Sequence, residues 1–122
     1  MKKLLVAVAL SVLSIPVSAK ADALQTVHPF HLAFAAVNKC IEPTSKELNR
    51  FNAWYLLASN NAALDLSINQ RDITYDQIKE MFDTDIEHAS QAVNQAFEET
   101  GCQAKEIKRS IEFFHTQVNT GK

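Results

Sequence analysis

The sequence predicts an all-α protein: a compact bundle of four to five helices closed by one disulfide bond. Three observations lead to this prediction. The 122-residue chain contains only two glycines and three prolines, and it has no run of alternating polar and apolar residues that would mark a β-strand. Apolar residues instead recur at steps of three and four. Two cysteines, Cys40 and Cys102, stand at the ends of predicted helices.

The N-terminal residues have the pattern of a Sec-type signal peptide. Lys2 and Lys3 precede an apolar run that ends at Pro16, and small residues follow it. The apolar run is shorter than the roughly 20 residues that a membrane span needs. No cysteine follows the run to carry a lipid anchor, so we expect a soluble exported protein.

Two positions fit signal cleavage, after Ala19 and after Ala21. We therefore expect a signal peptide over residues 1–19 and a single helical domain over residues 20–122. The expected location is the periplasm, with no membrane attachment after cleavage.

Cys40 and Cys102 are the only cysteines, and an exported chain folds in an oxidising compartment, so we expect a disulfide between them. In the chain-entropy account, a crosslink over so long a loop stabilises a domain by about 4 kcal/mol. A metal site on two cysteines is the alternative, but the chain lacks the Cys-x-x-Cys spacing and clustered histidines typical of zinc. We expect no metal and no cofactor.

The charge of the chain is uneven. It carries 12 basic and 14 acidic residues, but within residues 65–99 only Arg71 and Lys79 offset a series of acidic residues. An exported protein without a basic face is not expected to bind nucleic acid. An acidic surface instead favours cationic partners and speeds encounter with them.

The first helix of the domain is expected over residues 29–40, with Pro29 in its first turn, where a missing N–H leaves no hydrogen bond unmade. Pro43 ends it. Its predicted buried stripe consists of Phe30, Ala33, Phe34, Val37 and Ile41.

The second helix is expected over residues 45–59, and Thr44 with Glu47 forms a capping box at its start. Its predicted core residues are Leu48, Phe51, Tyr55 and Ala58, and Trp54 flanks them. Asn60 and Asn61 either form a kink or let the chain continue into a third helix over residues 62–68. In that third helix, Leu64 and Ile68 are expected to face inward.

The longest helix is expected over residues 75–100. Thr74 and Gln77 form a capping box at its start, and Gly101 stands where a left-handed residue would end it. A second capping pattern at Thr84 leaves a kink near Asp83 open, but unbroken apolar spacing favours one helix. Its predicted buried stripe is Tyr75, Ile78, Phe82, Ile86, Ala89, Val93 and Phe97.

The last helix is expected over residues 104–118, and its predicted buried stripe is Ala104, Ile107, Ile111, Phe114 and Val118. The predicted disulfide connects the end of the first helix to the turn that precedes the last helix.

A ladder of carboxylates lies on one side of the long helix. At about 100° per residue, Asp76, Glu80, Asp83 and Glu87 share a face about 120° round from the apolar stripe. Such a ladder is either a solvated surface or a contact surface for a cationic protein. Asp85 stands apart from it, closer to the apolar stripe, where we expect it to be partly buried against a partner subunit or hydrogen-bonded at a kink.

Trp54 is a candidate interface anchor, because it combines a large apolar area with a polar tip. The alternative is a core aromatic residue packed beside Tyr55. An exposed tryptophan in so small a domain would indicate a partner or a homodimer.

Catalytic machinery is not expected in this chain. There is no Gly-x-Ser-x-Gly elbow and no glycine-rich phosphate loop, and both thiols are assigned to the disulfide. His28 and His31 could share a helix face as metal ligands. However, no carboxylate stands at helical spacing beside them, so we interpret both as surface or capping residues.

The mature chain resembles the small helical periplasmic immunity proteins of type VI secretion systems. The likeness is carried by chain length, by the placement of Cys40 and Cys102, and by the stretch Asn52-Ala53-Trp54-Tyr55-Leu56-Leu57. It is nearest to the immunity protein that neutralises a spike protein carrying a peptidoglycan-hydrolase domain. The resemblance implies inhibition by occupying the cleft of a lysozyme-like effector, often by a homodimer. It assigns no contact residues.

The alternative function is a periplasmic stress chaperone of the small, disulfide-bonded, acid-activated type. Such a protein exposes apolar surface when its carboxylates are neutralised. Chain size, the single disulfide and the many carboxylates all agree with that class.

Overall fold

Four α-helices and one short 3-10 helix make up residues 17–121, the part of the chain that the computed structural model describes. In chain order they are α2 (Val17–Cys40), α3 (Ser45–Asn69), α4 (Tyr75–Thr100), η1 (Gly101–Gln103) and α5 (Lys105–Asn119). The prediction of an all-α bundle with one disulfide is confirmed. The predicted signal peptide lies outside the described residues except at its end, where α2 has already begun.

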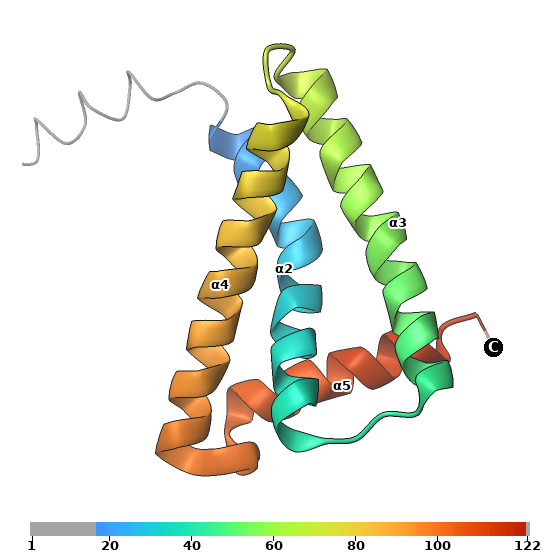
Figure 1. Ribbon diagram of the computed structural model, residues 1–122, viewed down its shortest axis with the longest axis vertical. Helices are drawn as coiled ribbons and strands as arrows, with labels where there is room; N and C mark the ends of the chain where they lie inside the picture. The colour runs from blue at the N-terminus through green and yellow to red at the C-terminus, as the bar shows by residue number, and fades with distance from the viewer. Residues whose placement is uncertain (1–16, 122) are drawn as a thin grey trace, which may run out of the picture.

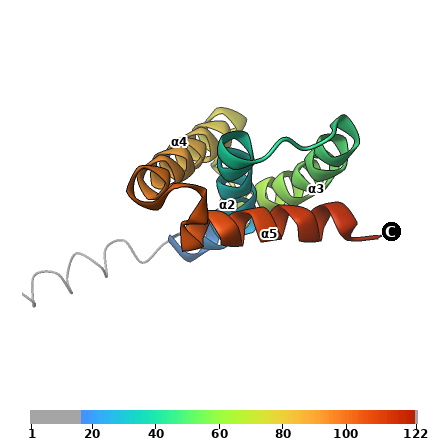
Figure 2. The ribbon, with the colours of Figure 1, turned by 90° about the horizontal axis from the view of Figure 1, so that it is seen from below.

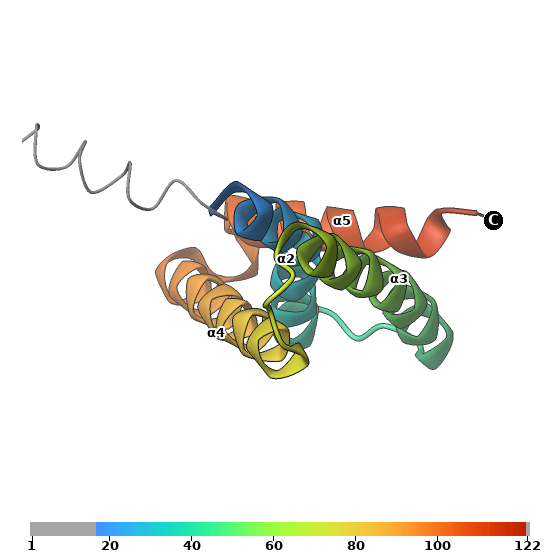
Figure 3. The same cartoon turned by 90° about the horizontal axis from the view of Figure 1, so that it is seen from above.

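Helix α2 is the centre of the bundle, and the other three long helices pack around it (Figure 1). Seen from below, α3 and α4 lie to either side of α2, and α5 crosses the remaining side (Figure 2). The view from above shows the same order, with α3 and α4 on the side of α2 away from α5 (Figure 3).

Three groups of buried apolar side chains hold these helices together. One joins α2, α3 and α5 around Phe30, Phe51 and Phe114. A second joins α2, α3 and α4 near the loop between α3 and α4, around Val27 and Leu66. A third joins α2, α4 and α5 and consists of Ala36, Val93, Ala96, Ala104 and Ile107.

The prediction for the first helix is wrong at its N-terminal end. The structure begins α2 at Val17, so Pro29 lies inside the helix rather than in its first turn. An internal proline removes one backbone hydrogen bond and strains the turn before it. Packing outweighs this cost, because Ala23 and Val27, both preceding the proline, are almost fully buried against α3 and α4.

The segments 45–59 and 62–68 form one continuous helix, the second of the two alternatives left open at Asn60 and Asn61. This continuity makes the expected inward direction of Leu64 and Ile68 wrong, because both are more than half exposed. Without a break, the buried stripe that begins at Phe51 keeps its phase. Its later positions are therefore Ala62 and Leu66.

Both predicted capping boxes are confirmed, at Thr44 for α3 and at Thr74 for α4. Helix α4 runs unbroken through Asp83, as favoured. Its predicted buried stripe is wrong at two positions, because Tyr75 is 77% exposed and Ile86 is 44% exposed. Tyr75 is the first residue of α4, and Ile86 lies on the side of the stripe away from the buried Ile78, Ala89 and Ala96.

The corner after α4 differs in detail from the prediction. Gly101 has a positive φ of 78°, as expected for a helix-ending glycine, but its ψ of −160° lies outside the left-handed helical region. The chain turns there into η1. Cys102 in η1 forms the predicted disulfide with Cys40, with Cα atoms 5.7 Å apart. The bond fixes the end of α2 to the start of the α5 segment.

Candidate functional site

The predicted acidic ladder lies on the surface of α4. Asp76, Glu80, Asp83 and Glu87 are all exposed. One of them has an ion-pair partner on its own helix, because Nζ of Lys79 lies 2.9 Å from Oδ2 of Asp83. The hydrogen bond to Asp83 raises the pKa of Lys79 above its ordinary value, and the charge of Asp83 adds to the effect.

Trp54 does not join the ladder. It lies half-buried on α3 and packs against the aromatic cluster that α2 and α5 share with that helix. The structure therefore places Trp54 as an aromatic residue at the edge of the core, the alternative to an interface anchor. The ladder stands on α4, a different helix.

Four polar side chains from three helices meet on the side of α4 that faces α2, away from the ladder. His28 and His31 come from α2, Tyr55 from α3 and Asp85 from α4. Oδ2 of Asp85 lies 2.7 Å from Nδ1 of His31 and 2.9 Å from Nδ1 of His28. The second ring nitrogen of His31 lies 2.7 Å from the Tyr55 hydroxyl oxygen. We call these four residues the histidine–aspartate cluster.

The cluster contains the most buried histidine of the described chain. His31 is 3% exposed, and the side chain of Asp85 is 12% exposed. Within residues 17–121, no buried side-chain nitrogen or oxygen lacks a hydrogen-bond partner. A buried polar group costs stability only when its hydrogen bonds are unmade, so the cluster joins three helices without that penalty.

Tyr55 contributes a protonated hydroxyl to the cluster. Burial raises the pKa of Tyr55 above its ordinary value of 10.0, and the carboxylates of Asp83 and Asp85 raise it further. The phenol therefore keeps its proton at neutral pH. Nδ1 of His31 donates to Asp85, because a carboxylate oxygen accepts, and Nε2 of the same ring pairs with the Tyr55 hydroxyl.

An acid–imidazole–hydroxyl chain of this kind is the arrangement that activates serine nucleophiles. Here the hydroxyl is a phenol whose raised pKa opposes its conversion to a reactive phenolate. The arrangement is instead suited to fixing α2, α3 and α4 relative to one another.

Sequence reasoning missed this cluster. The interpretation of both histidines as surface or capping residues is wrong for His31, which is buried in the bundle. Carboxylates were considered only on the same helix face, whereas Asp85 lies 54 residues from His31 along the chain. The expectation that Asp85 is partly buried is confirmed, but its partners are histidines of its own chain. The available signal was its position near the apolar stripe, away from the ladder.

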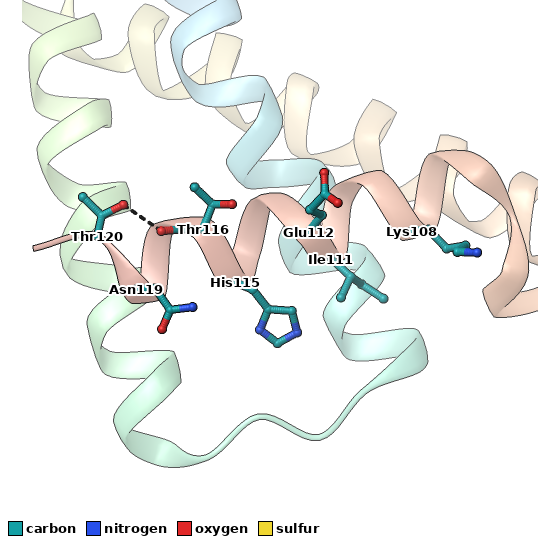
Figure 4. A pocket seen from close by; sticks show the side chains of 7 residues that line it. All are labelled: Lys108, Ile111, Glu112, His115, Thr116, Asn119 and Thr120. Carbon is teal, nitrogen blue, oxygen red and sulfur yellow. Dashed lines mark hydrogen bonds between the residues drawn. The ribbon is translucent and has the colours of Figure 1, made fainter. Parts of the chain in front are cut away.

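A hollow also lies on the surface of α5, and Figure 4 shows the side chains around it. All of them come from α5 and the residue that follows it: Lys108, Ile111, Glu112, His115, Thr116, Asn119 and Thr120. The hydroxyl of Thr120 donates to the backbone carbonyl of Thr116 at 2.7 Å. No second element supplies an opposing group to this lining.

Two further findings apply to the described part of the chain. Across residues 17–121, no group of three or more histidine, cysteine, aspartate or glutamate side chains is suited to holding a metal ion. None of the helices placed in that range is long and apolar enough to cross a membrane.

Comparison with known proteins identifies no family for this chain. No protein-family model matches it. No curated protein and no solved structure matches it significantly. The class that the fold defines is therefore an all-α, disulfide-bonded helical bundle, and its function has to be argued from its surfaces.

Proposed function

We propose that the protein is an exported immunity protein of a type VI secretion system, which binds and inhibits a cell-wall-degrading effector in the periplasm. The observation that carries this proposal is the exposed ladder of Asp76, Glu80, Asp83 and Glu87 on α4. Inhibition by occupation requires an accessible and rigid surface rather than reactive groups, because a preorganised surface loses little entropy on binding.

Charge complementarity supports this partner. An enzyme that cuts an anionic wall polymer benefits from a basic rim around its cleft, since such a rim attracts the substrate. An acidic ladder is attracted to the same rim, orients the inhibitor over the cleft and speeds encounter.

Contact area beside the ladder is also available. Tyr75 and Ile86 are exposed on the same helix. Exposed aromatic and aliphatic side chains flanked by charge have the composition of binding hot spots, in which the apolar group supplies affinity and the charges supply orientation.

The proposal is tested by expressing candidate peptidoglycan hydrolases in the periplasm with and without this protein, scoring lysis and co-purification. The test variant reverses two ladder charges, Asp76→Lys and Glu80→Lys. The matched control reverses Glu98 and Glu99, which are exposed near the other end of α4. We expect the ladder variant to bind at least about tenfold more weakly, mainly through slower association with less salt dependence.

Equal binding by the ladder and control variants would remove the ladder from the proposal. Failure of the unmodified protein to prevent lysis by any wall hydrolase of its host would overturn the immunity function itself.

A periplasmic chaperone is the second candidate. The observation that favours it is the set of aliphatic side chains that stand more than half exposed on α3: Leu56, Leu57, Leu64 and Ile68. Apolar surface of this kind can hold unfolded clients. Suppression of the aggregation of a denatured client protein at pH 3, with loss of near-ultraviolet dichroism, would support the chaperone over the immunity protein.

A further inference from the structure

The loop between α3 and α4 forms a tight turn at one end of the molecule. Figure 1 shows this loop at the end of the bundle opposite to α5. The backbone N–H of Ile73 donates to the carbonyl of Gln70 at 3.1 Å, so Arg71 and Asp72 occupy the two central positions of a β-turn. Both of these side chains are exposed. We call residues 70–73 the apical turn.

The apical turn is fixed on both sides. Before it, the backbone N–H of Gln70 donates to the carbonyl of Leu66 at 2.8 Å. After it, Ile73 packs against the apolar group that contains Leu66, and Thr74 caps the start of α4. A surface that is already ordered loses little conformational entropy when it binds. The apical turn is therefore a preformed projection.

The charges at this end of the molecule place one cation among acidic residues. Within residues 65–80, four acidic side chains are exposed: Asp65, Asp72, Asp76 and Glu80. Lys79 is one of two basic residues in this range, and its Nζ lies 2.9 Å from Oδ2 of Asp83. Arg71 is the other, and it has no ion pair or hydrogen bond with any residue that the structure describes. Its guanidinium is therefore available to a partner.

Apolar side chains flank the apical turn. Tyr75 is 77% exposed, Ile68 is 66% exposed and Leu64 is 58% exposed. Apolar groups around a central polar contact exclude water from it when a complex forms. Exclusion of water strengthens the attraction between opposite charges. The surroundings of Arg71 thus favour a strong ion pair in a complex.

We propose that the apical turn enters the active-site cleft of the target hydrolase and that Arg71 pairs there with a catalytic carboxylate. This inference rests on the proposed function. Glycoside hydrolases carry two carboxyl groups in the cleft, and a basic rim attracts the anionic wall polymer. The apical turn has the opposite pattern, with a cation at its centre and acids around it. A guanidinium suits this role because it binds a carboxylate through two parallel hydrogen bonds.

The acidic ladder continues from the apical turn. Asp76 lies in the first turn of α4, and the ladder extends about 16 Å along the helix from there to Glu87. With the apical turn in the cleft, the ladder reaches the basic rim. The same pattern of charge disfavours a zinc-dependent wall hydrolase, because the metal ion in its cleft would repel Arg71. The geometry therefore selects a glycoside hydrolase.

The first experiment uses the hydrolase against which the unmodified protein protects cells, and it measures affinity. We expect Arg71→Glu to bind about a hundredfold more weakly, because it adds a third carboxylate to the cleft. Arg71→Lys should bind about tenfold more weakly, since an ammonium group cannot form the two parallel hydrogen bonds. The matched control is Arg109→Glu, which changes an exposed arginine on α5 and should leave the affinity unchanged. Thermal unfolding checks that each variant is folded.

The second experiment tests whether Arg71 lies in the cleft. Replacing one catalytic carboxylate of the hydrolase with the matching amide should weaken binding of the unmodified protein, and it should strengthen binding of Arg71→Glu. The unmodified protein should also compete with soluble peptidoglycan fragments. Tight binding by Arg71→Glu, inhibition without competition, or a zinc-dependent target would overturn this inference and leave the proposed function intact. Protection against no wall hydrolase would overturn both.

Discussion

Oδ2 of Asp85 lies 2.7 Å from Nδ1 of His31, so a carboxylate of α4 fixes the most buried histidine of the described chain on α2. The same carboxylate also contacts His28, and His31 continues the chain of hydrogen bonds to Tyr55. Helices α3 and α4 diverge from their connecting loop in Figure 1. The hydrogen bonds of the cluster therefore connect α3 and α4 where apolar packing between these two helices is limited.

Replacing Asp85 with asparagine should lower the free energy of unfolding by about 1–3 kcal/mol, because an amide presents a donor toward ring nitrogens that need an acceptor. Urea unfolding at pH 7 measures the change. The control is Asp83→Asn, which removes an ion pair between side chains that are 61% and 58% exposed. That loss should cost less than about 1 kcal/mol. Similar losses in both variants would contradict the role given to the cluster.

Tyr55 should make the protein sensitive to alkali. Its pKa is raised in the folded state by burial and by the charges of Asp83 and Asp85. The neutral phenol is therefore favoured by folding. The stabilisation is fully present below the ordinary tyrosine pKa of about 10 and is lost as the pH rises through the higher folded value.

Thermal unfolding measured from pH 9 upward tests this expectation. The melting temperature should fall in strongly alkaline buffer for the unmodified protein and fall less steeply for Tyr55→Phe. Parallel curves for the two proteins would show that Tyr55 does not link stability to pH.

Removal of the disulfide should lower the free energy of unfolding by about 2–5 kcal/mol. Cys40 and Cys102 are 62 residues apart in sequence, so the bond restricts a long segment of the unfolded chain. The double variant Cys40→Ala and Cys102→Ala, compared with the oxidised protein in urea, measures the effect. The unmodified protein in a reducing agent is the control and should reproduce the loss. A fall below about 1 kcal/mol would contradict the prediction.

Arg50 should hold the end of α5 in place. Its guanidinium donates from Nε to the carbonyl of Val118 and from Nη2 to that of Thr120, which are carbonyls at a helix end without helical partners. We expect Arg50→Ala to cost about 1–3 kcal/mol and to speed amide exchange over the last turn of α5. Lys46→Ala, an exposed residue one turn earlier, is the matched control. Unchanged exchange at the end of α5 would contradict this role.

Local signals in the sequence predicted much of the fold. The capping boxes at Thr44 and Thr74 act within four residues, and the structure forms both. The long apolar stripe of α4 likewise predicted one helix across Asp83. These features depend on residues that are neighbours along the chain, so the sequence pattern alone predicts them.

The errors arose where tertiary packing, rather than local sequence, determines the structure. Pro29 marks a helix start by local rules, but burial of Ala23 and Val27 extends α2 through it. Assigning a new helix after Asn61 reset the expected phase and turned Leu64 inward, whereas one continuous α3 leaves it exposed. The cluster around His31 could not be predicted, because its partners come from helices far apart in sequence.

The disulfide also determines how the chain would behave if it were cut. Cys40 precedes α3, and Cys102 follows α4, so both helices and the loop between them belong to one covalent ring. A single protease cut in that loop, near Arg71, would leave the two fragments joined through sulfur. Such a nicked molecule would migrate as two bands only after reduction. Helices α2 and α5 lie outside the ring, and the disulfide between Cys40 and Cys102 would still hold their adjoining ends together.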